Sequence, residues 1–123
     1  MSDTEATATQ GKGILVVEDD PSLRLLYRIN LELEDYRVRE AATIEEAREA
    51  VAAERPALVF LDVRLGESPS DMLLDELRDA GIPVVVVSGT VDVEHYESRA
   101  SAVLGKPFEP ESLVAAARAL AVG

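Results

Sequence analysis

The sequence has no cysteine and a single histidine, and this scarcity narrows the chemistry open to the chain. Without cysteine there are no disulfides and no thiolate metal sites, so the fold depends on packing alone, as in a cytosolic protein. One histidine, His95, argues against a zinc or copper site. We expect His95 to lie at the surface, because nothing near it in the sequence supplies the setting of a phosphorylated histidine.

Positive charge and long apolar runs are also scarce. The chain has 12 lysines and arginines against 24 acidic residues, which gives a formal net charge of −12. Such a charge repels nucleic acid and anionic lipid surfaces, so we expect no direct binding of nucleic acid or membranes. No apolar run is long enough to span a bilayer, and the acidic start of the chain is unlike a signal peptide. These features together predict a cytoplasmic protein.

The length of 123 residues suits one domain. The first residues are small and polar, which predicts a flexible N-terminal tail over residues 1–12 and a folded domain over residues 13–123. Within that domain, short apolar runs alternate with helical patterns. The apolar runs predict strands near residues 14–17, 36–41, 57–61, 84–87 and 102–105.

Helix signals follow four of these strands. Asp20 and Pro21 form an N-cap and a first helical position, Thr43 opens a capping box, and Pro110 begins the last helix. Ser70 is predicted to cap a further helix after a loop over residues 63–69. Five strand–helix units with short connections predict right-handed crossovers and a parallel sheet covered by helices on both faces. For the first helix, the spacing predicts an inward face made of Leu23, Leu26, Ile29 and Leu33.

Polar residues follow four of the apolar runs. Glu18 and Asp19 come after the first run, and Asp62, Ser88 and Lys106 come after the third, fourth and fifth. Because the carboxyl ends of parallel strands share one edge, where such folds bind ligands, we expect these side chains to meet. The sequence therefore predicts a pocket that holds several carboxylates, a hydroxyl and an ammonium group.

The predicted pocket suits a hard divalent cation. Carboxylates that crowd together raise one another's pKa unless a cation compensates them, and Mg²⁺ prefers a few carboxylates with open positions for phosphate oxygens. A lone carboxylate beside such a cation invites phosphoryl transfer, and Asp62 is the predicted acceptor. Lys106 would then neutralise the added charge, and Ser88 could donate a hydrogen bond to a phosphoryl oxygen.

Taken in order, these residues resemble the receiver domains of two-component response regulators, from about Gly13 to the end of the chain. Residues 14–24, Ile-Leu-Val-Val-Glu-Asp-Asp-Pro-Ser-Leu-Arg, resemble the family's first strand, acidic pair and helix start. Lys106-Pro107-Phe108 resembles its Lys-Pro-Phe motif, which contains a cis peptide. The resemblance implies a flavodoxin-like α/β fold of the single-domain, chemotaxis type. This is a three-layer (βα)5 sandwich whose parallel five-stranded sheet has the order 2-1-3-4-5.

The resemblance also implies roles and partners. Asp62 matches the phosphorylated aspartate and Ser88 the Ser/Thr switch residue, while Glu18 and Asp19 match the acidic pair. The Mg²⁺ ligands would be these three acids together with the backbone carbonyl of Arg64. The donor would be a histidine kinase or a histidine phosphotransfer protein, and the output a downstream protein. Such a receiver is not a separate enzyme, but it assists its own Mg²⁺-dependent phosphorylation and dephosphorylation.

The chain departs from the family pattern in three places. Residues 65–70 read Leu-Gly-Glu-Ser-Pro-Ser where the family commonly has Met-Pro-x-Met-Asp-Gly. Val103 stands where many receivers have Tyr or Phe. The stretch from Ser88 to Lys106 is about one helical turn shorter than in chemotaxis-type receivers. This difference predicts a short or irregular helix over residues 91–99. We expect activation to change the loop after Ser88 with little dimerisation.

Other interpretations remain open from the sequence. A pseudo-receiver would keep the fold and pocket and act only as a protein docking module. A phosphatase of the haloacid dehalogenase type would want a second Asp two residues after its nucleophile, and Arg64 occupies that position. A flavodoxin-like cofactor binder would need a Ser, Thr or Gly phosphate loop after the first strand, where residues 18–21 are Glu-Asp-Asp-Pro. The acids at 18–20 could also be a solvated helix cap.

Overall fold

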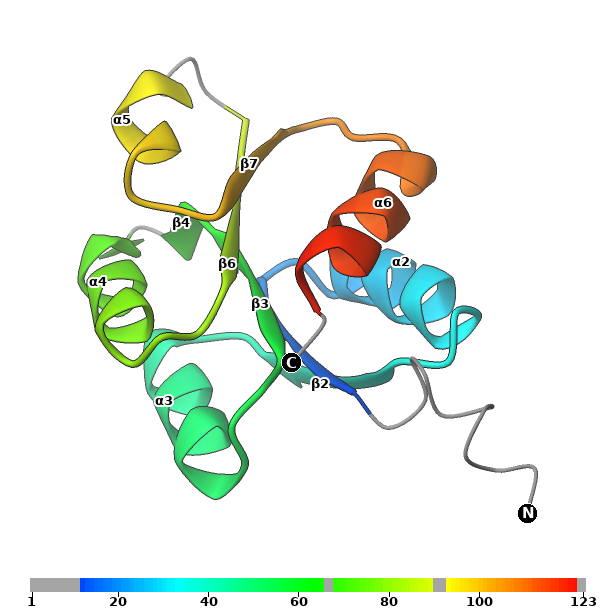
Figure 1. Cartoon of the computed structure of the whole chain (residues 1–123), viewed down its shortest axis with the longest axis horizontal. Helices are drawn as coiled ribbons and strands as arrows, with labels where there is room; N and C mark the ends of the chain where they lie inside the picture. Colours follow the sequence, from blue (N-terminus) through cyan, green and yellow to red (C-terminus); the bar gives the residue numbers. More distant parts are fainter. Residues whose placement is uncertain (1–11, 66–67, 90–92, 122–123) are drawn as a thin grey trace.

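The fold alternates strands and helices along the chain, as the computed structural model shows for residues 12–65, 68–89 and 93–121 (Figure 1). The strands of the main sheet are β1 (Gly13–Val17), β2 (Arg37–Ala41), β3 (Leu58–Asp62), β6 (Val84–Ser88) and β7 (Ala102–Gly105). The helices are α2 (Pro21–Glu32), α3 (Ile44–Ala53), α4 (Asp71–Asp79), α5 (Val93–Glu97) and α6 (Pro110–Leu120). The predicted tail over residues 1–12 lies outside the described residues, except for Lys12.

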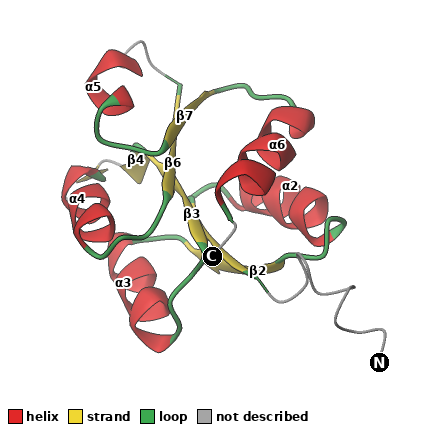
Figure 2. Ribbon diagram, viewed as in Figure 1, coloured by secondary structure: helices red, strands yellow, loops and turns green. Residues whose placement is uncertain are grey.

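The main sheet has five strands in the order β2-β1-β3-β6-β7, and every neighbouring pair is parallel. Counted along this sheet alone, the order is 2-1-3-4-5, which confirms the predicted flavodoxin-like topology. Helices α2 and α6 cover one face of the sheet, and α3, α4 and α5 cover the other (Figures 1 and 2). The polypeptide therefore forms the predicted three layers.

The central strands are apolar on both faces because both faces are covered. Along β3, Leu58 and Phe60 contribute to the core beneath α2 and α6, whereas Val59 and Leu61 contribute to the core beneath α3, α4 and α5. Strands β1 and β6 alternate between the two cores in the same way. Side chains along a strand alternate between the two faces of the sheet, so Asp62, at the end of β3, is on the same face as Leu58 and Phe60.

The predicted caps of α2 and α3 are present. Asp20 caps α2 by accepting a hydrogen bond from the Ser22 amide at 2.8 Å, with Pro21 as the first helical residue. Thr43 caps α3 by accepting from the Glu46 amide at 3.1 Å. These caps satisfy amide groups that have no partner within their own helix.

The inward face of α2 differs from the prediction. The structure buries Tyr27 and Leu31, whereas Ile29 is 51% exposed and Leu33, just after the helix, is 75% exposed. The other two residues of the predicted face are half-buried. Apolar residues lie on more than one side of this helix, so spacing alone could not select the buried side. Packing selects it, because the Tyr27 ring lies 5.4 Å from that of Phe60 on β3.

The segment after β3 also differs from the predicted loop over residues 63–69. It contains a short antiparallel pair, β4 (Arg64–Leu65) with β5 (Ser68–Pro69), and residues 66–67 lie outside the described residues. Further along, α5 is five residues long, which agrees with the predicted short helix, although residues 90–92 are also not described. Among the described residues, no helix has the length and apolar character needed to cross a membrane.

Candidate functional site

Three acidic residues meet at the carboxyl edge of the sheet. Glu18 and Asp19 follow β1, Asp62 ends β3, and the parallel pairing of Val17 with Leu61 sets these two strand ends side by side. One carboxylate oxygen from each acid lies within 4.8 Å of the other two. Glu18 and Asp62 are buried, and Asp19 is exposed. The structure therefore groups the acids that the sequence predicted to meet.

Lys106 reaches the same cluster from the end of β7. Its Nζ donates to Asp62 Oδ2 at 3.0 Å and lies 3.3 Å from Glu18 Oε1. The peptide bond between Lys106 and Pro107 is cis. The ammonium thus pairs with two carboxylates that would otherwise face each other without compensation.

Ser88 belongs to β6, the strand that lies between β3 and β7 in the sheet. It ends β6, directly after Val87, which pairs with Asp62 across the sheet. Ser88 is 2% exposed, and its carbonyl accepts a hydrogen bond from the Lys106 amide at 2.8 Å. The predicted pocket residues therefore share one edge of the sheet, although their roles remain predictions.

Arg64 lies two residues beyond Asp62, at the start of β4. Its backbone N–H donates to Asp62 Oδ1 at 3.1 Å, while its side chain is exposed. Both carboxylate oxygens of Asp62 thus accept a hydrogen bond, Oδ1 from this amide and Oδ2 from Lys106. The predicted role of the Arg64 carbonyl as a metal ligand stays a prediction.

The electrostatics of the cluster favour an additional cation. Burial and the negative charge of Asp62 raise the pKa of Glu18 from 4.5 to about 7. Burial disfavours the charge on Lys106, but its hydrogen bond to Asp62 and the nearby negative charges outweigh that cost and raise the pKa of the lysine. The single ammonium of Lys106 therefore does not balance the negative charge of the three acids.

The donor set fits Mg²⁺. Glu18 Oε1 is buried and accepts no hydrogen bond within the described part of the chain, although Lys106 Nζ is close to it. A buried oxygen without a hydrogen bond, next to two further carboxylates, suits a hard cation that binds oxygen ligands. His95 lies elsewhere. It is exposed, as predicted, and its Nε2 lies 3.2 Å from Asp71 Oδ2.

Two side chains that the sequence did not assign to the site hold its backbone. Ser70 precedes α4, but its hydroxyl donates to the Asp62 carbonyl at 2.6 Å instead of capping the helix as predicted. Its amide donates to the Val63 carbonyl at 2.9 Å. Arg24 Nη1 donates to the carbonyl of Glu18 at 2.8 Å. Neither contact has a local sequence signal, because each one joins residues from different elements.

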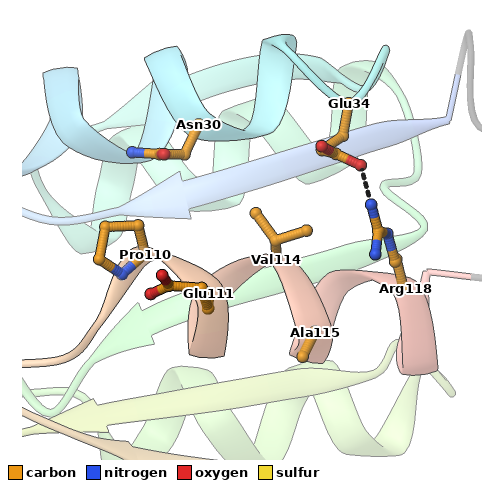
Figure 3. Close-up of a pocket in the computed structure, with 7 residues that line it drawn as sticks. All are labelled: Asn30, Glu34, Pro110, Glu111, Val114, Ala115 and Arg118. Carbon is orange, nitrogen blue, oxygen red and sulfur yellow. Dashed lines mark hydrogen bonds and ion pairs between the residues drawn. The ribbon is translucent and has the colours of Figure 1, made fainter.

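Two of the grooves on this domain involve residues of α2, and they differ in their relation to the site. The first is mostly apolar and opens beside Lys106, where its lining residues are Leu23, Leu26, Gly89, Lys106, Pro107 and Phe108. The second lies between α2 and α6, and the ion pair of Glu34 with Arg118 borders it (Figure 3). It contains none of the predicted site residues, whereas Lys106 of the acidic cluster lines the first groove.

Known proteins share this sequence pattern and fold. A family model described as the response regulator receiver domain matches residues 14–118. The chain is 39% identical over 116 residues to the DNA-binding response regulator MtrA of Mycolicibacterium smegmatis, covering 90% of this chain and 51% of that protein. It is 31% identical over 112 residues to the transcriptional regulatory protein SrrA of Staphylococcus aureus, covering 87% of this chain and 46% of that protein. The chain thus spans about half the length of these curated relatives.

Solved structures show the same likeness. The receiver domain of NtrX from Brucella abortus superposes with a TM-score of 0.81 at 33% identity, covering 88% of this chain and 97% of that chain. A CheY-like receiver domain protein from Methanospirillum hungatei superposes with a TM-score of 0.82 at 27% identity, covering 89% of this chain and 93% of that chain. Both likenesses extend over nearly the whole described fold.

Proposed function

Because this chain belongs to the response regulator receiver family, we propose that it is a phosphoacceptor switch and that Asp62 takes the phosphoryl group. The observation that carries this proposal is the setting of Asp62. Its carboxylate ends a central strand, is hydrogen-bonded to Lys106, and lies within a cluster with Glu18 and Asp19. A carboxylate next to a fixed ammonium and a cation-binding group is arranged to receive a phosphoryl group.

The proposed donor is a phosphohistidine on a histidine kinase or a phosphotransfer protein. A carboxylate oxygen of Asp62 attacks the phosphorus atom, and a P–O bond forms as the P–N bond to the imidazole breaks. The imidazole leaves with the electron pair of that bond and takes up a proton. Hydrolysis later adds water at phosphorus, releases inorganic phosphate and restores the Asp62 carboxylate.

The residues around Asp62 would hold the charge of the phosphoryl group. Lys106 is already within hydrogen-bond distance of the carboxylate, and Ser88 at the end of the neighbouring strand would donate its hydroxyl to a phosphoryl oxygen. Glu18, Asp19, Asp62 and the carbonyl of Arg64 would hold Mg²⁺. When bound, Mg²⁺ would neutralise part of the negative charge on the oxygens of the transferred phosphoryl group.

The output would follow from a shift between two states of the protein. New contacts from the phosphoryl group to Ser88 and Lys106 would favour one state, and a downstream protein would bind that state. We expect little dimerisation on activation. We also expect this acidic domain itself to bind no nucleic acid, because its charge of −12 repels a phosphate backbone. Its place of action, the cytoplasm, is likewise a proposal.

Phosphorylation with a small donor tests this function. We expect acetyl phosphate and Mg²⁺ to add one phosphoryl group per chain, observed by intact-mass measurement, and Asp62→Asn to abolish the addition. Asp20→Asn is the matched control, because the Asp20 carboxylate lies at the same edge and caps α2, and the substitution keeps the Asp20 amide that donates to Glu18 Oε2. Asparagine caps a helix as well as aspartate, so this variant should be phosphorylated like the wild type.

Two results would count against the proposal. If the Asp62→Asn variant still gained a phosphoryl group, the acceptor would be another residue. Wild-type protein that binds Mg²⁺ but stays unmodified would favour the pseudo-receiver, which acts as a docking module without phosphorylation.

A further inference from the structure

Arg24 on α2 is the only described arginine that contacts the backbone of the acidic pair. Its Nε donates to Glu40 Oε1 at 2.9 Å, and its Nη1 donates to the carbonyl of Glu18 at 2.8 Å. The side chain of Arg24 is 21% exposed, so it is mostly covered. Glu40, which lies on β2, orients the guanidinium while the second donor group reaches the segment after β1.

The carbonyl that Arg24 holds belongs to the peptide joining Glu18 to Asp19. Because a peptide unit is planar, fixing its oxygen constrains the Cα atoms of both acids. The preceding peptide is held as well, since the Glu18 amide donates to the Ala41 carbonyl on β2 at 2.9 Å. The two predicted metal-binding acids after β1 are thus attached to β2 and to α2 through their main chain.

We propose that Arg24 is a positioning residue for the Mg²⁺ site, acting through the Glu18 carbonyl. The proposal rests on the proposed function, because Glu18 and Asp19 matter here as metal ligands. Arg24 would not contact the ion. It would keep the two carboxylates at the separation that allows them to bind one cation together with Asp62.

The sign of the effect separates positioning from simple electrostatics. Removing a positive charge near an acidic site should by itself tighten the binding of a cation, because like charges repel. Loss of a residue that orients the ligands should weaken binding, and changes around metal ligands commonly do so by about tenfold or more. The two explanations therefore predict opposite changes in Mg²⁺ affinity.

Arg28 provides the matched control. It lies one turn further along α2, and its Nε donates to the other oxygen of Glu40 at 2.6 Å. Its Nη1 donates to Glu32 at 2.7 Å instead of to the segment after β1. Arg24→Gln and Arg28→Gln each remove one positive charge and one contact to Glu40, but only the first removes the contact to the Glu18 carbonyl.

The experiment is calorimetric titration of Mg²⁺ into the metal-free protein, with urea unfolding to confirm that each variant is folded. We expect Arg24→Gln to weaken Mg²⁺ binding by about tenfold and Arg28→Gln to bind as the wild type or slightly tighter. Arg24→Gln with unchanged or tighter binding would overturn the proposal, as would equal weakening in both variants.

Failure of this inference is distinguishable from failure of the proposed function. Wild-type protein that binds no Mg²⁺ and gains no phosphoryl group would contradict the proposed function itself. Wild-type protein that does both, with Arg24→Gln binding Mg²⁺ normally, would contradict only the role of Arg24.

Discussion

The two sides of the acidic site are held in different ways. On the β1 side, Arg24 donates to the Glu18 carbonyl, so a mostly covered guanidinium anchors the main chain itself. On the other side, Asp71 at the start of α4 holds α5 through side chains, with Arg99 at 2.9 Å and the Tyr96 hydroxyl at 3.0 Å. The first arrangement fixes the main chain at Glu18 and Asp19. The second depends on partly exposed charges, which stabilise less because water and salt screen them.

Ser70 joins the second side to Asp62. Its hydroxyl holds the Asp62 carbonyl, and the next residue, Asp71, holds α5. The α5 side is thus connected to Asp62 by a short stretch of chain, but its own contacts are weaker than the core packing beneath α2. The comparison indicates a firm β1 side and a more easily loosened α5 side.

The largest expected effect comes from the core beneath α2. Leu31 is fully buried, so Leu31→Ala should lower the free energy of unfolding by about 2–5 kcal/mol. Ile29→Ala, on the exposed side of the same helix, should change it by within about 0.5 kcal/mol. Urea unfolding of both variants measures the difference. Equal losses would show that α2 also buries the face predicted from spacing.

A second prediction concerns pH and Glu18. The free carboxyl has a pKa of 4.5 and the folded one about 7, so between these values the folded protein retains a proton that the unfolded chain releases. Stability of the metal-free protein should therefore fall as pH rises from about 4.5 to about 7, and the loss should be complete above that range. Mg²⁺ favours the ionised carboxylate and should reduce the loss.

Urea midpoints measured between pH 5 and pH 8 test this prediction, with Glu18→Gln as the control. The variant cannot ionise at this position, so it should lack this part of the pH dependence. The same slope in wild type and variant would contradict the raised pKa of Glu18.

The smallest expected effect lies on the α5 side. Asp71→Asn removes the charge that pairs with Arg99, and exposed ion pairs contribute about 0.2–1 kcal/mol. Asp75→Asn, which removes only the other ion pair of Arg99, is the control and should cost less. Hydrogen exchange of the α5 amides should rise more in Asp71→Asn than in Asp75→Asn. Equal exchange in the two variants would show that Asp71 does not hold α5.

The sequence predicted the topology and the strand-end residues well, because both depend on strong local patterns. Apolar runs reveal buried strands, and each polar residue directly after such a run is placed by the strand before it. The inward face of α2 was missed because that helix has apolar residues on several sides. The short β4–β5 pair was missed because two residues per strand are too few to show a period.

The contacts of Ser70 and Arg24 could not be predicted for a different reason. A serine before a helix is usually a cap, and only the return of the chain to β3 brings the Ser70 hydroxyl to the Asp62 carbonyl. For Arg24, the partner depends on how α2 lies over the end of β1. Both contacts are products of tertiary structure with no local sequence pattern.

The central claim is that Asp62 is the residue that carries the phosphoryl group. Borohydride reduction of the protein after treatment with acetyl phosphate and Mg²⁺, followed by peptide mass spectrometry, tests it directly, because reduction converts an aspartyl phosphate to homoserine. We expect homoserine at position 62 and at no other acid of the site. Reduced product at Glu18 or Asp19 in place of Asp62, or at none of the three, would contradict the account.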